Sequence, residues 1–252
     1  MSTTSLFDIY AGVYEKKFNQ NRMGIYQRSR VHREMAKWLT PGSLILDIGC
    51  GPGSDFHFYK SLNLSVHAID SSEKMIRLAQ QEARRLNFNA RIEQSRFQDC
   101  TFRDKYDAVI LNFGVINVFH PLDPVLEKID SLLKADGKVV IVSMPPVQLF
   151  LSGEWLLTFQ WRALYRRLFL KKAMVSEDTE IFYYRCKDFQ PYFRVLDSIP
   201  LGTFLPTPDQ YARHPLLRKM GDFLLPIEHF FSSFLPEWMG GDHVFYLLGK
   251  KI

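Results

Sequence analysis

Short apolar segments alternate with amphipathic segments through the central part of the chain. Five of the apolar segments are rich in Val and Ile, as buried parallel strands are, and they cover residues 43–49, 65–70, 90–97, 106–114 and 137–144. Apolar positions at helical spacing predict helices over 54–62, 71–87 and 123–137, the last of which we expect to end at Gly137. Strands that alternate with helices in this way predict a doubly wound α/β fold around a mostly parallel sheet.

The two flanks of this core have different patterns. Residues 1–40 predict two helices, and residues 193–202 and 241–251 predict two further strands, which brings the sheet to seven strands. The stretch before the last strand is aromatic and is interrupted by prolines. We therefore predict one domain over residues 1–252, with a helical cap over 1–40, a cofactor-binding core over 41–145, an insertion that forms a lid over 146–240 and a last strand over 241–252.

The charge and the cysteines argue against several classes of protein. The net charge of +5 is spread along the chain, so we expect no nucleic-acid partner. Cys50, Cys100 and Cys186 share no spacing typical of metal sites or disulfide frameworks, which predicts no metal and reduced thiols in a cytoplasmic protein. We also expect neither a signal peptide nor a transmembrane helix.

A glycine-rich loop follows the first predicted strand, in the stretch LILDIGCGPGSD. Gly49, Gly51 and Gly53 lie at alternate positions, where side chains would block the approach of the backbone to a ligand, and a helix N-terminus follows. The spacing differs from the GxGxxG of dinucleotide sites. Asp47 lies two residues before the first glycine, so it disfavours a pyrophosphate and favours a cationic ligand without phosphate, such as S-adenosylmethionine.

Polar segments also follow the next three predicted strands. Asp70 ends the second strand, beside Ser71, at the place where an acid accepts hydrogen bonds from ribose hydroxyls in doubly wound folds. The segment FQDC, after the third strand, offers a side-chain acceptor to the exocyclic amine of adenine and a backbone N–H to a ring nitrogen. The residues concerned are Gln98, Asp99 and, through its N–H, Cys100. Asn112 and Phe113, after the fourth strand, would line the methionine end of the ligand.

Taken in order, the segments DIGCGPG, AID, QD and ILNFG resemble those of class I S-adenosylmethionine-dependent methyltransferases of the small-molecule type. The resemblance covers roughly residues 40–145, and it implies a Rossmann-like fold with S-adenosyl-L-methionine as methyl donor and S-adenosyl-L-homocysteine as product. It implies cofactor contacts at Asp47, Gly49, Gly51, Asp70, Asp99, Cys100 and Asn112, with Cys50 as a small residue of the turn. FDIYAGVYEKKF also resembles the cap helix of many small-molecule members, in which a Tyr and a later Arg reach the cofactor; Tyr14 and Arg28 are the matching positions.

The motifs predict methyl transfer but no particular catalytic residue. His120, after the fourth strand, is the candidate general base, and His243 and His229 are weaker alternatives. Asn112 is not followed by the Pro-Pro-aromatic sequence of amino-methylating nucleic-acid enzymes, and no Pro-Cys of cytosine C5 enzymes occurs. By elimination the acceptor is small. The aromatic insertion favours a hydrophobic acceptor, such as a quinone, a phenolic, a polyketide-like molecule or a lipid, methylated at O or C.

Other interpretations remain open. The sequence pI of about 9.0 supports an RNA or protein methyltransferase, and a noncatalytic S-adenosylmethionine-binding module would need only the binding motifs. The aromatic residues of the insertion fit a core or a dimer face as well as a lid, so a monomer and a homodimer are both compatible. WRALYRRLFLKK mixes apolar and basic residues as helices at membrane surfaces do, which predicts transient contact with a membrane surface.

Overall fold

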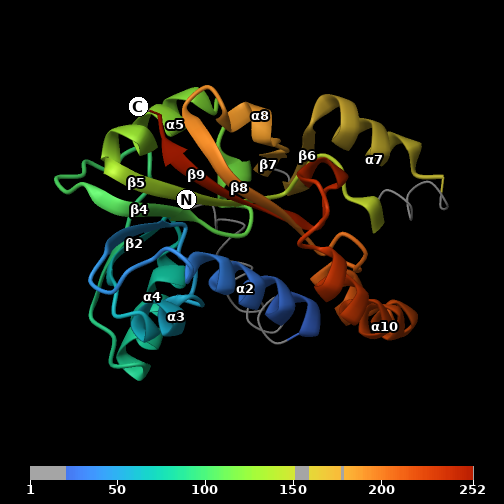
Figure 1. The fold of residues 1–252 in the computed structure, drawn as a ribbon, viewed down its shortest axis with the longest axis horizontal. Helices are drawn as coiled ribbons and strands as arrows, with labels where there is room; N and C mark the ends of the chain where they lie inside the picture. Colours follow the sequence, from blue (N-terminus) through green and yellow to red (C-terminus); the bar gives the residue numbers. More distant parts are fainter. Residues whose placement is uncertain (1–20, 151–158, 177–178, 252) are drawn as a thin grey trace, which may run out of the picture.

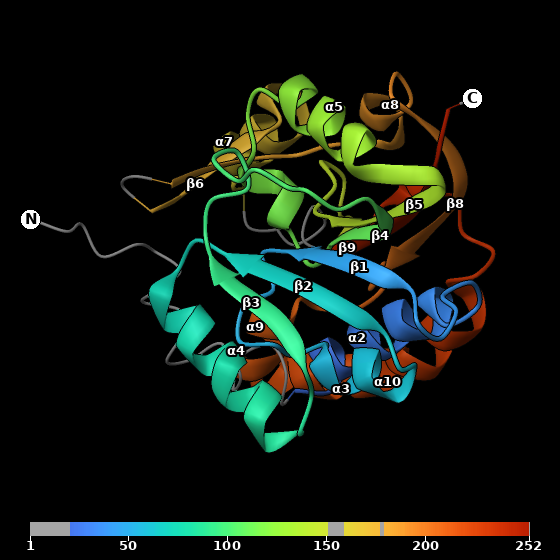
Figure 2. The ribbon, with the colours of Figure 1, turned by 90° about the vertical axis from the view of Figure 1, so that its left-hand side faces the viewer.

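The computed structural model describes residues 21–150, 159–176 and 179–251. Its centre is a seven-stranded sheet in the order β3-β2-β1-β4-β5-β9-β8 (Figure 1, Figure 2). The strands are β1 (Leu44–Ile48), β2 (Ser65–Asp70), β3 (Ala90–Gln94), β4 (Tyr106–Leu111), β5 (Leu133–Ser143), β8 (Phe193–Leu201) and β9 (His243–Lys250). β9 runs antiparallel to β5 and β8, and the other six strands of this sheet run parallel to one another. The predicted doubly wound, mostly parallel, seven-stranded sheet is therefore confirmed.

Helices cover both faces of the sheet (Figure 1). One face carries α2 (Arg22–Met35), α3 (Phe56–Ser61) and α4 (Glu73–Arg85), and the other carries α5 (Asp123–Leu132) and α8 (Cys186–Phe189). The remaining elements are η2 (Val115–Val118), α7 (Trp161–Tyr165), η3 (Arg166–Leu170), β6 (Lys172–Ser176), β7 (Thr179–Phe182), α9 (Pro208–Arg213), α10 (Pro215–Phe231) and η4 (Glu237–Met239). Among the described residues, no helix is both long enough and apolar enough to cross a membrane.

Side chains alternate along the central strands and so divide the core into two layers. In β4, Ala108 and Ile110 face the layer of α2, α3 and α4, whereas Val109 and Leu111 face the layer of α5. Because both faces of the central strands are buried, these strands need apolar residues at every position. This is the physical reason for the continuous Val- and Ile-rich segments of the sequence.

The helix predicted over 123–137 is shorter than expected. It ends at Leu132, because Leu133 adopts an extended backbone conformation and pairs with Tyr106 at the start of β4. Gly137 therefore lies inside β5 and does not end a helix. The prediction relied on Gly137 as a helix terminator, but the pairing of Leu133 with β4 ends the helix before Gly137.

Two predicted strands also end earlier than expected. The strand predicted to reach residue 97 ends at Gln94, and the chain then turns, with the N–H of Asp99 bonded to the carbonyl of Arg96. The strand predicted to reach residue 114 ends at Leu111, because Phe113 and Gly114 have φ of 49° and 85°. Backbone in this left-handed region cannot continue a strand. Both turns lie at the carboxyl edge of the sheet, so the strand ends become loops around the site.

The segment predicted as a lid over 146–240 contributes to more than one part of the molecule. β8 lies at the edge of the main sheet, and β6 and β7 form a separate antiparallel pair. α10 packs beside α2 (Figure 1), where Met23, Tyr26, Leu205 and Tyr211 form a small third apolar cluster. Only part of this segment therefore lies near the carboxyl ends of the parallel strands.

A buried carboxylate joins α10 to the turn that follows β8. Oε1 of Glu228 accepts hydrogen bonds from the N–H groups of Gly202 (2.8 Å) and Thr203 (3.2 Å), and Oε2 accepts one from Phe204 (3.0 Å). The Glu228 side chain is fully buried. This contact fixes the backbone that leads from the sheet to α9.

We expect Glu228→Ala to lower the free energy of unfolding by about 3 kcal/mol, because three backbone donors lose their acceptor where water has little access. Urea unfolding followed by circular dichroism measures the change. Glu127→Ala removes an exposed carboxylate from α5 and serves as the control, with an expected change under about 0.5 kcal/mol. Equal effects of the two substitutions would contradict the proposed role of Glu228.

Candidate functional site

The glycine loop after β1 combines a tightly packed residue with an open one. Gly49, Gly51 and Gly53 have φ of 68°, 56° and 80°, a region that L side chains rarely adopt. A Cβ on Gly49 would lie 2.6 Å from Cγ2 of Val115 in η2, whereas a Cβ on Gly51 would meet nothing within 4 Å. Gly49 therefore lets η2 approach the loop, and Gly51 presents bare backbone to open space.

Asp70 holds this loop from the end of the neighbouring strand. Its Oδ2 accepts a hydrogen bond from the N–H of Gly51 at 3.0 Å, and its Oδ1 accepts one from the N–H of Ser72 at 2.8 Å. Ser72 caps α4 through a bond from the N–H of Met75 to its side chain. The Asp70 carboxylate therefore lies between the glycine loop and the start of α4.

A cavity of about 630 Å³ opens along the carboxyl edge of the sheet beside these residues. This volume is within the range of small-molecule sites. Eight residues from the sequence prediction line it: Arg28, Gly49, Gly51, Asp70, Ser71, Gln98, Asn112 and Phe113. The fold thus brings residues from five separate segments to one space.

Five other predicted residues do not line the cavity, and Tyr14 lies outside the described residues. Asp47 is buried beneath the loop, where burial and the nearby Asp55 carboxylate raise the pKa of Asp47 well above its ordinary value. Cys50 is buried, and its Sγ lies 3.6 Å from the carbonyl oxygen of Gly51. Asp47 and Cys50 are therefore placed as supports of the turn.

The remaining three of these residues are Asp99, Cys100 and His120. Asp99 is exposed to solvent, and the N–H of Cys100 donates to the carbonyl of Arg96 at 3.2 Å, so it is not directed at a ligand. His120 is exposed and stacks on Phe182, with 4.1 Å between ring centroids. None of these three residues therefore lines the cavity.

Lys128, on α5, fixes the loop that follows β3. Its Nζ donates hydrogen bonds to the carbonyls of Phe97 (2.7 Å), Gln98 (2.9 Å) and Cys100 (2.7 Å). The same ammonium lies 4.9 Å from the centroid of the Phe97 ring. Lys128 therefore positions the cavity wall at Phe97 and Gln98. The sequence prediction missed it because a single Lys on an amphipathic helix carries no distinguishing signal.

Asp55, which the sequence prediction also passed over, joins three elements beneath the cavity. Its Oδ1 accepts hydrogen bonds from Nη1 of Arg28 and from Nε2 of His32 (2.7 Å), both on α2, and its Oδ2 accepts one from Nδ2 of Asn112 (2.8 Å). Burial acts to raise the pKa of Asp55, but the Arg28 guanidinium and His32 hold that pKa well below its usual range. The Arg28 guanidinium also lies 4.6 Å from the ring centroid of Phe113.

One buried oxygen beside this group has no partner. Oδ1 of Asn112 makes no hydrogen bond within the part of the chain that the structure describes, although Nδ2 of the same amide is bonded to Asp55. Asn112 lines the cavity. A buried acceptor of this kind requires a donor, and the ammonium of S-adenosylmethionine would supply one. With the open backbone of Gly51 and the carboxylate of Asp70, this end of the cavity fits that cofactor.

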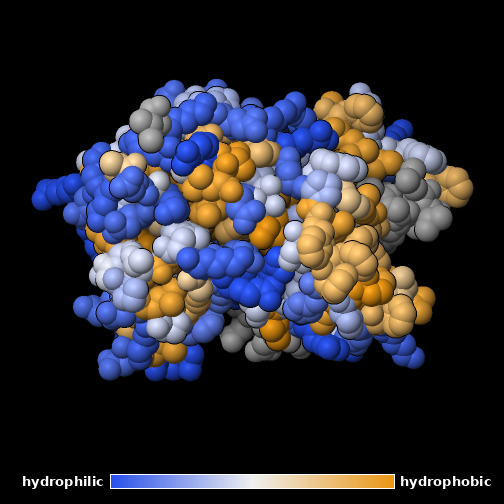
Figure 3. Space-filling view, viewed as in Figure 1, coloured by the Kyte–Doolittle hydropathy of each residue, from blue (hydrophilic) through white to orange (hydrophobic). Residues whose placement is uncertain are grey.

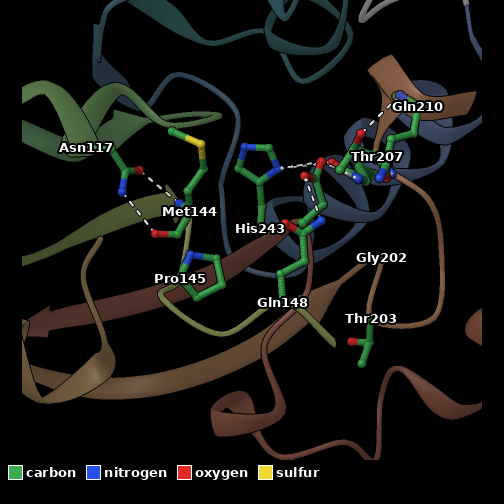
Figure 4. Close-up of polar contacts among 12 residues, drawn as sticks. Asn117, Met144, Pro145, Gln148, Gly202, Thr203, Thr207, Gln210 and His243 are labelled. Carbon is green, nitrogen blue, oxygen red and sulfur yellow. Dashed lines mark hydrogen bonds and ion pairs between the residues drawn. The ribbon is translucent and has the colours of Figure 1, made fainter. Parts of the chain in front are cut away.

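A second polar group lines the same cavity. Nδ1 of His243, at the start of β9, lies 3.2 Å from Oδ2 of Asp242 and 3.2 Å from Oε1 of Gln27. Figure 4 shows the opposite edge of the ring on the side of Met144. Burial acts to raise the pKa of Asp242, but His243 and Gln27 hold that pKa below its usual range. The structure therefore places His243, and not His120, at the cavity.

Asn117 fixes the wall opposite this group. Its Oδ1 accepts a hydrogen bond from the N–H of Met144 at 2.9 Å, and its Nδ2 donates to the carbonyls of Met144 (3.0 Å) and Phe182 (2.6 Å) (Figure 4). Asn117 is fully buried in η2. It thereby ties the end of β5 to β7, so that Met144 and Ile181 line the cavity together.

Comparison with known proteins relates this fold and site to one family. Residues 39–183 match the family described as methyltransferase domain. A demethylmenaquinone methyltransferase of Clavibacter sepedonicus is 31% identical over 155 residues, which cover 60% of this chain and 62% of that protein. An uncharacterized protein of Methanocaldococcus jannaschii is 29% identical over 137 residues, 54% of this chain and 49% of that protein. The matches thus span less than two thirds of these relatives.

Solved structures of similar fold cover nearly the whole chain. The methyltransferase in a complex with the Trm112 activator of Haloferax volcanii has a TM-score of 0.63 and 14% identity, with full coverage of both chains. A Pyrococcus horikoshii protein has a TM-score of 0.61 and 16% identity, covering 96% of this chain and 99% of its own. These likenesses show that the chain shares its fold with both proteins. The family match spans more than half of the chain. The chain therefore belongs to the methyltransferase domain family, within class I of the S-adenosylmethionine-dependent methyltransferases.

We expect Asp55→Asn to lower the free energy of unfolding at pH 7 by about 3–5 kcal/mol, because Arg28 would lose its buried partner. The pKa of Asp55 is lower in the folded than in the unfolded state, so its contribution is complete at neutral pH and declines as the pH falls below about 4. The difference in the free energy of unfolding between wild type and Asp55→Asn should therefore become smaller as the pH falls below about 4.

Urea unfolding of both proteins from pH 7 down to the acid limit of the native state measures this difference. Asp104→Asn is the control, because Asp104 is exposed and its carboxylate lies 3.9 Å from Nη1 of Arg91. Its removal should change the stability by less than about 1 kcal/mol. A difference for Asp55→Asn that stays constant with pH would mean that its charge does not stabilise the fold.

Proposed function

We propose that this protein transfers the methyl group of S-adenosylmethionine to an oxygen or carbon atom of a small, hydrophobic acceptor. The observation that carries this proposal is a cavity whose lining combines two kinds of residue. The glycine loop, Asp70 and Asn112 form a polar part, and large apolar side chains and His243 form the rest of the described lining. Bound S-adenosylmethionine supplies a methyl group on a positively charged sulfur, which needs no further activation.

The polar part of the cavity lining has a suitable group for each part of that cofactor. The Asp70 carboxylate would accept hydrogen bonds from the ribose hydroxyls, and Oδ1 of Asn112 would accept one from the ammonium. Phe97 and Gln98, held by Lys128, would lie against the adenine. These assignments keep the predicted contacts at Asp70, Gln98 and Asn112.

Many other residues of the cavity lining are apolar. They include Phe119, Met144, Val175, Ile181 and Pro208. The charged residues that line the whole cavity are three acids, Asp70, Asp209 and Asp242, and two arginines, Arg28 and Arg96. A polymer rich in phosphate would meet little favourable charge here, which supports a small acceptor over RNA. Demethylmenaquinone, named for one curated relative, is an apolar quinone of the predicted kind.

His243 is placed to take a proton from the acceptor. Its Nδ1 faces Asp242 and Gln27, so a hydrogen on Nδ1 leaves Nε2 with a free lone pair. In the proposed step, a bond forms between the acceptor atom and the methyl carbon, the bond from methyl carbon to sulfur breaks, and its electron pair stays on sulfur. The proton of the acceptor goes to Nε2 of His243, and the ionised Asp242 stabilises the resulting imidazolium.

Cofactor binding tests the first half of this proposal. We expect isothermal titration calorimetry to show binding of S-adenosylmethionine and S-adenosylhomocysteine but not of NAD. Asp70→Ala should weaken this binding at least about tenfold, because the ribose hydroxyls lose a charged acceptor. Asp99→Ala should change it less than about twofold, since Asp99 lies outside the cavity. Binding of NAD alone, or equal effects of the two substitutions, would overturn the assignment.

Turnover tests the second half. With methyl-labelled S-adenosylmethionine and demethylmenaquinone, or an extract of quinones and phenols, mass spectrometry should detect a product that is one methyl group heavier. His243→Asn should lower kcat about 100-fold or more, as loss of a general base does, with cofactor affinity retained. His120→Asn is the matched control and should change kcat less than about twofold. A larger loss for His120→Asn than for His243→Asn would reverse the assignment.

A further inference from the structure

We propose that one end of the molecule binds the surface of an anionic lipid bilayer, through α10 and the segment 159–176. Leu216, Met220, Phe223, Ile227, Phe230 and, just beyond the helix, Phe234 recur at intervals of four and three. This spacing places them along one side of α10. All six are exposed, with 74% of Phe223 and 77% of Phe234 accessible to solvent.

The apolar stripe is not needed to hold α10 in the fold. The other side of the helix packs on α2, where the hydroxyl of Tyr26 donates to Ser232 at 3.3 Å, just after the helix, and Nη2 of Arg30 donates to Ser233 at 2.7 Å. Glu228 adds its three backbone contacts on that side. An exposed stripe of large apolar residues on an anchored helix indicates a binding surface.

The segment 159–176 carries a second group of exposed apolar residues at the same end of the molecule. Its members are Phe159, Trp161, Tyr165, Phe169, Leu170, Met174 and Val175. Figure 1 places α7 and α10 at one end of the molecule, and Figure 3 shows apolar residues gathered over that end. Aromatic residues, Trp and Tyr among them, are typical of the boundary between water and lipid.

The charge around these apolar residues favours an anionic partner. The segment 159–176 contains five basic residues and no acid. Arg167 is buried and Lys172 pairs with Glu180 at 2.8 Å, whereas Arg162 and Arg166 are exposed. The three carboxylates of residues 215–239, which cover α10 and the segment after it, each have an internal partner. Asp222 pairs with Arg22 (2.6 Å), Glu228 bonds the turn after β8, and Glu237 accepts from Tyr246 (2.8 Å). A second copy of this chain would bring like charges together, whereas anionic lipid headgroups would neutralise them.

The proposed lipid-binding surface is continuous with the cavity. Val175 in β6 lines the cavity, and 41% of it is exposed to solvent. Its neighbour Met174 is 49% exposed and belongs to the apolar surface. An apolar acceptor dissolved in a bilayer would thus have a short path to His243. This path rests on the proposed function, but the contact with the bilayer does not.

Sedimentation of the full chain with lipid vesicles tests the contact. The vesicles are made of phosphatidylcholine alone or of phosphatidylcholine mixed with phosphatidylglycerol. We expect binding to the anionic vesicles at least about tenfold tighter than to the neutral ones, and weaker binding at high salt. The double substitution Phe223→Ser with Phe230→Ser should reduce binding at least about tenfold, and Arg162→Glu with Arg166→Glu should remove the preference for anionic lipid.

Leu196→Ser and Arg194→Glu are the matched controls, because both residues are exposed on β8 and lie outside this surface. Neither should change binding more than about twofold. Circular dichroism of every variant verifies that it is folded. Vesicle binding that survives the paired substitutions would overturn the proposal. So would a concentration-dependent dimer that the same substitutions abolish, measured by ultracentrifugation without lipid. The vesicle assay contains neither methyl donor nor acceptor, so its result is independent of the proposed reaction.

Discussion

The buried carboxylate of Asp55 is the contact on which the arrangement of the site depends. It lies just before α3 and binds two residues of α2 and the amide at the end of β4. These elements come from separate parts of the chain, and no apolar contact would fix their relative positions as strictly as directional bonds to one anion do. Because Nδ2 of Asn112 is bonded to Asp55, the oxygen of the same amide remains without a partner among the described residues. The arrangement of the cofactor end thus depends on a carboxylate that does not itself line the cavity.

The fold could be predicted from the sequence because its signals are local. Continuous apolar strands, amphipathic helices and the glycine loop can each be recognised within about ten residues. The predictions were wrong where the structure of a segment depends on contacts with residues that are distant in the sequence. Leu133 leaves the helix to pair with Tyr106, 27 residues earlier, and α10 is placed by α2 at the other end of the chain. Pairing of this kind cannot be inferred from the pattern around either partner alone.

The candidate site could be predicted only in part, for the same reason. Gly49, Gly51, Asp70 and Asn112 follow strands directly, so the order of the sheet brings them together. His243 and Gln27 are 216 residues apart, and nothing near either residue indicates the other. The sequence favoured His120, which comes after the fourth predicted strand, over His243 at the start of the last one. The antiparallel direction of β9 brings its first residue to the carboxyl edge, and the pattern around His243 does not indicate this direction.

The adjacency of β5 and β9 has a consequence for how such an enzyme can change its specificity. The chain leaves β5 after Ser143 and enters β9 at His243, and in the sheet β5 and β9 are adjoining strands. Everything between them forms one excursion with neighbouring ends, which carries the apolar cavity wall, the edge strand β8 and the exposed surface of α10. The cofactor end is encoded almost entirely before this excursion. Recombination within the gene could therefore exchange the acceptor-binding half as a single block and leave the cofactor-binding half intact.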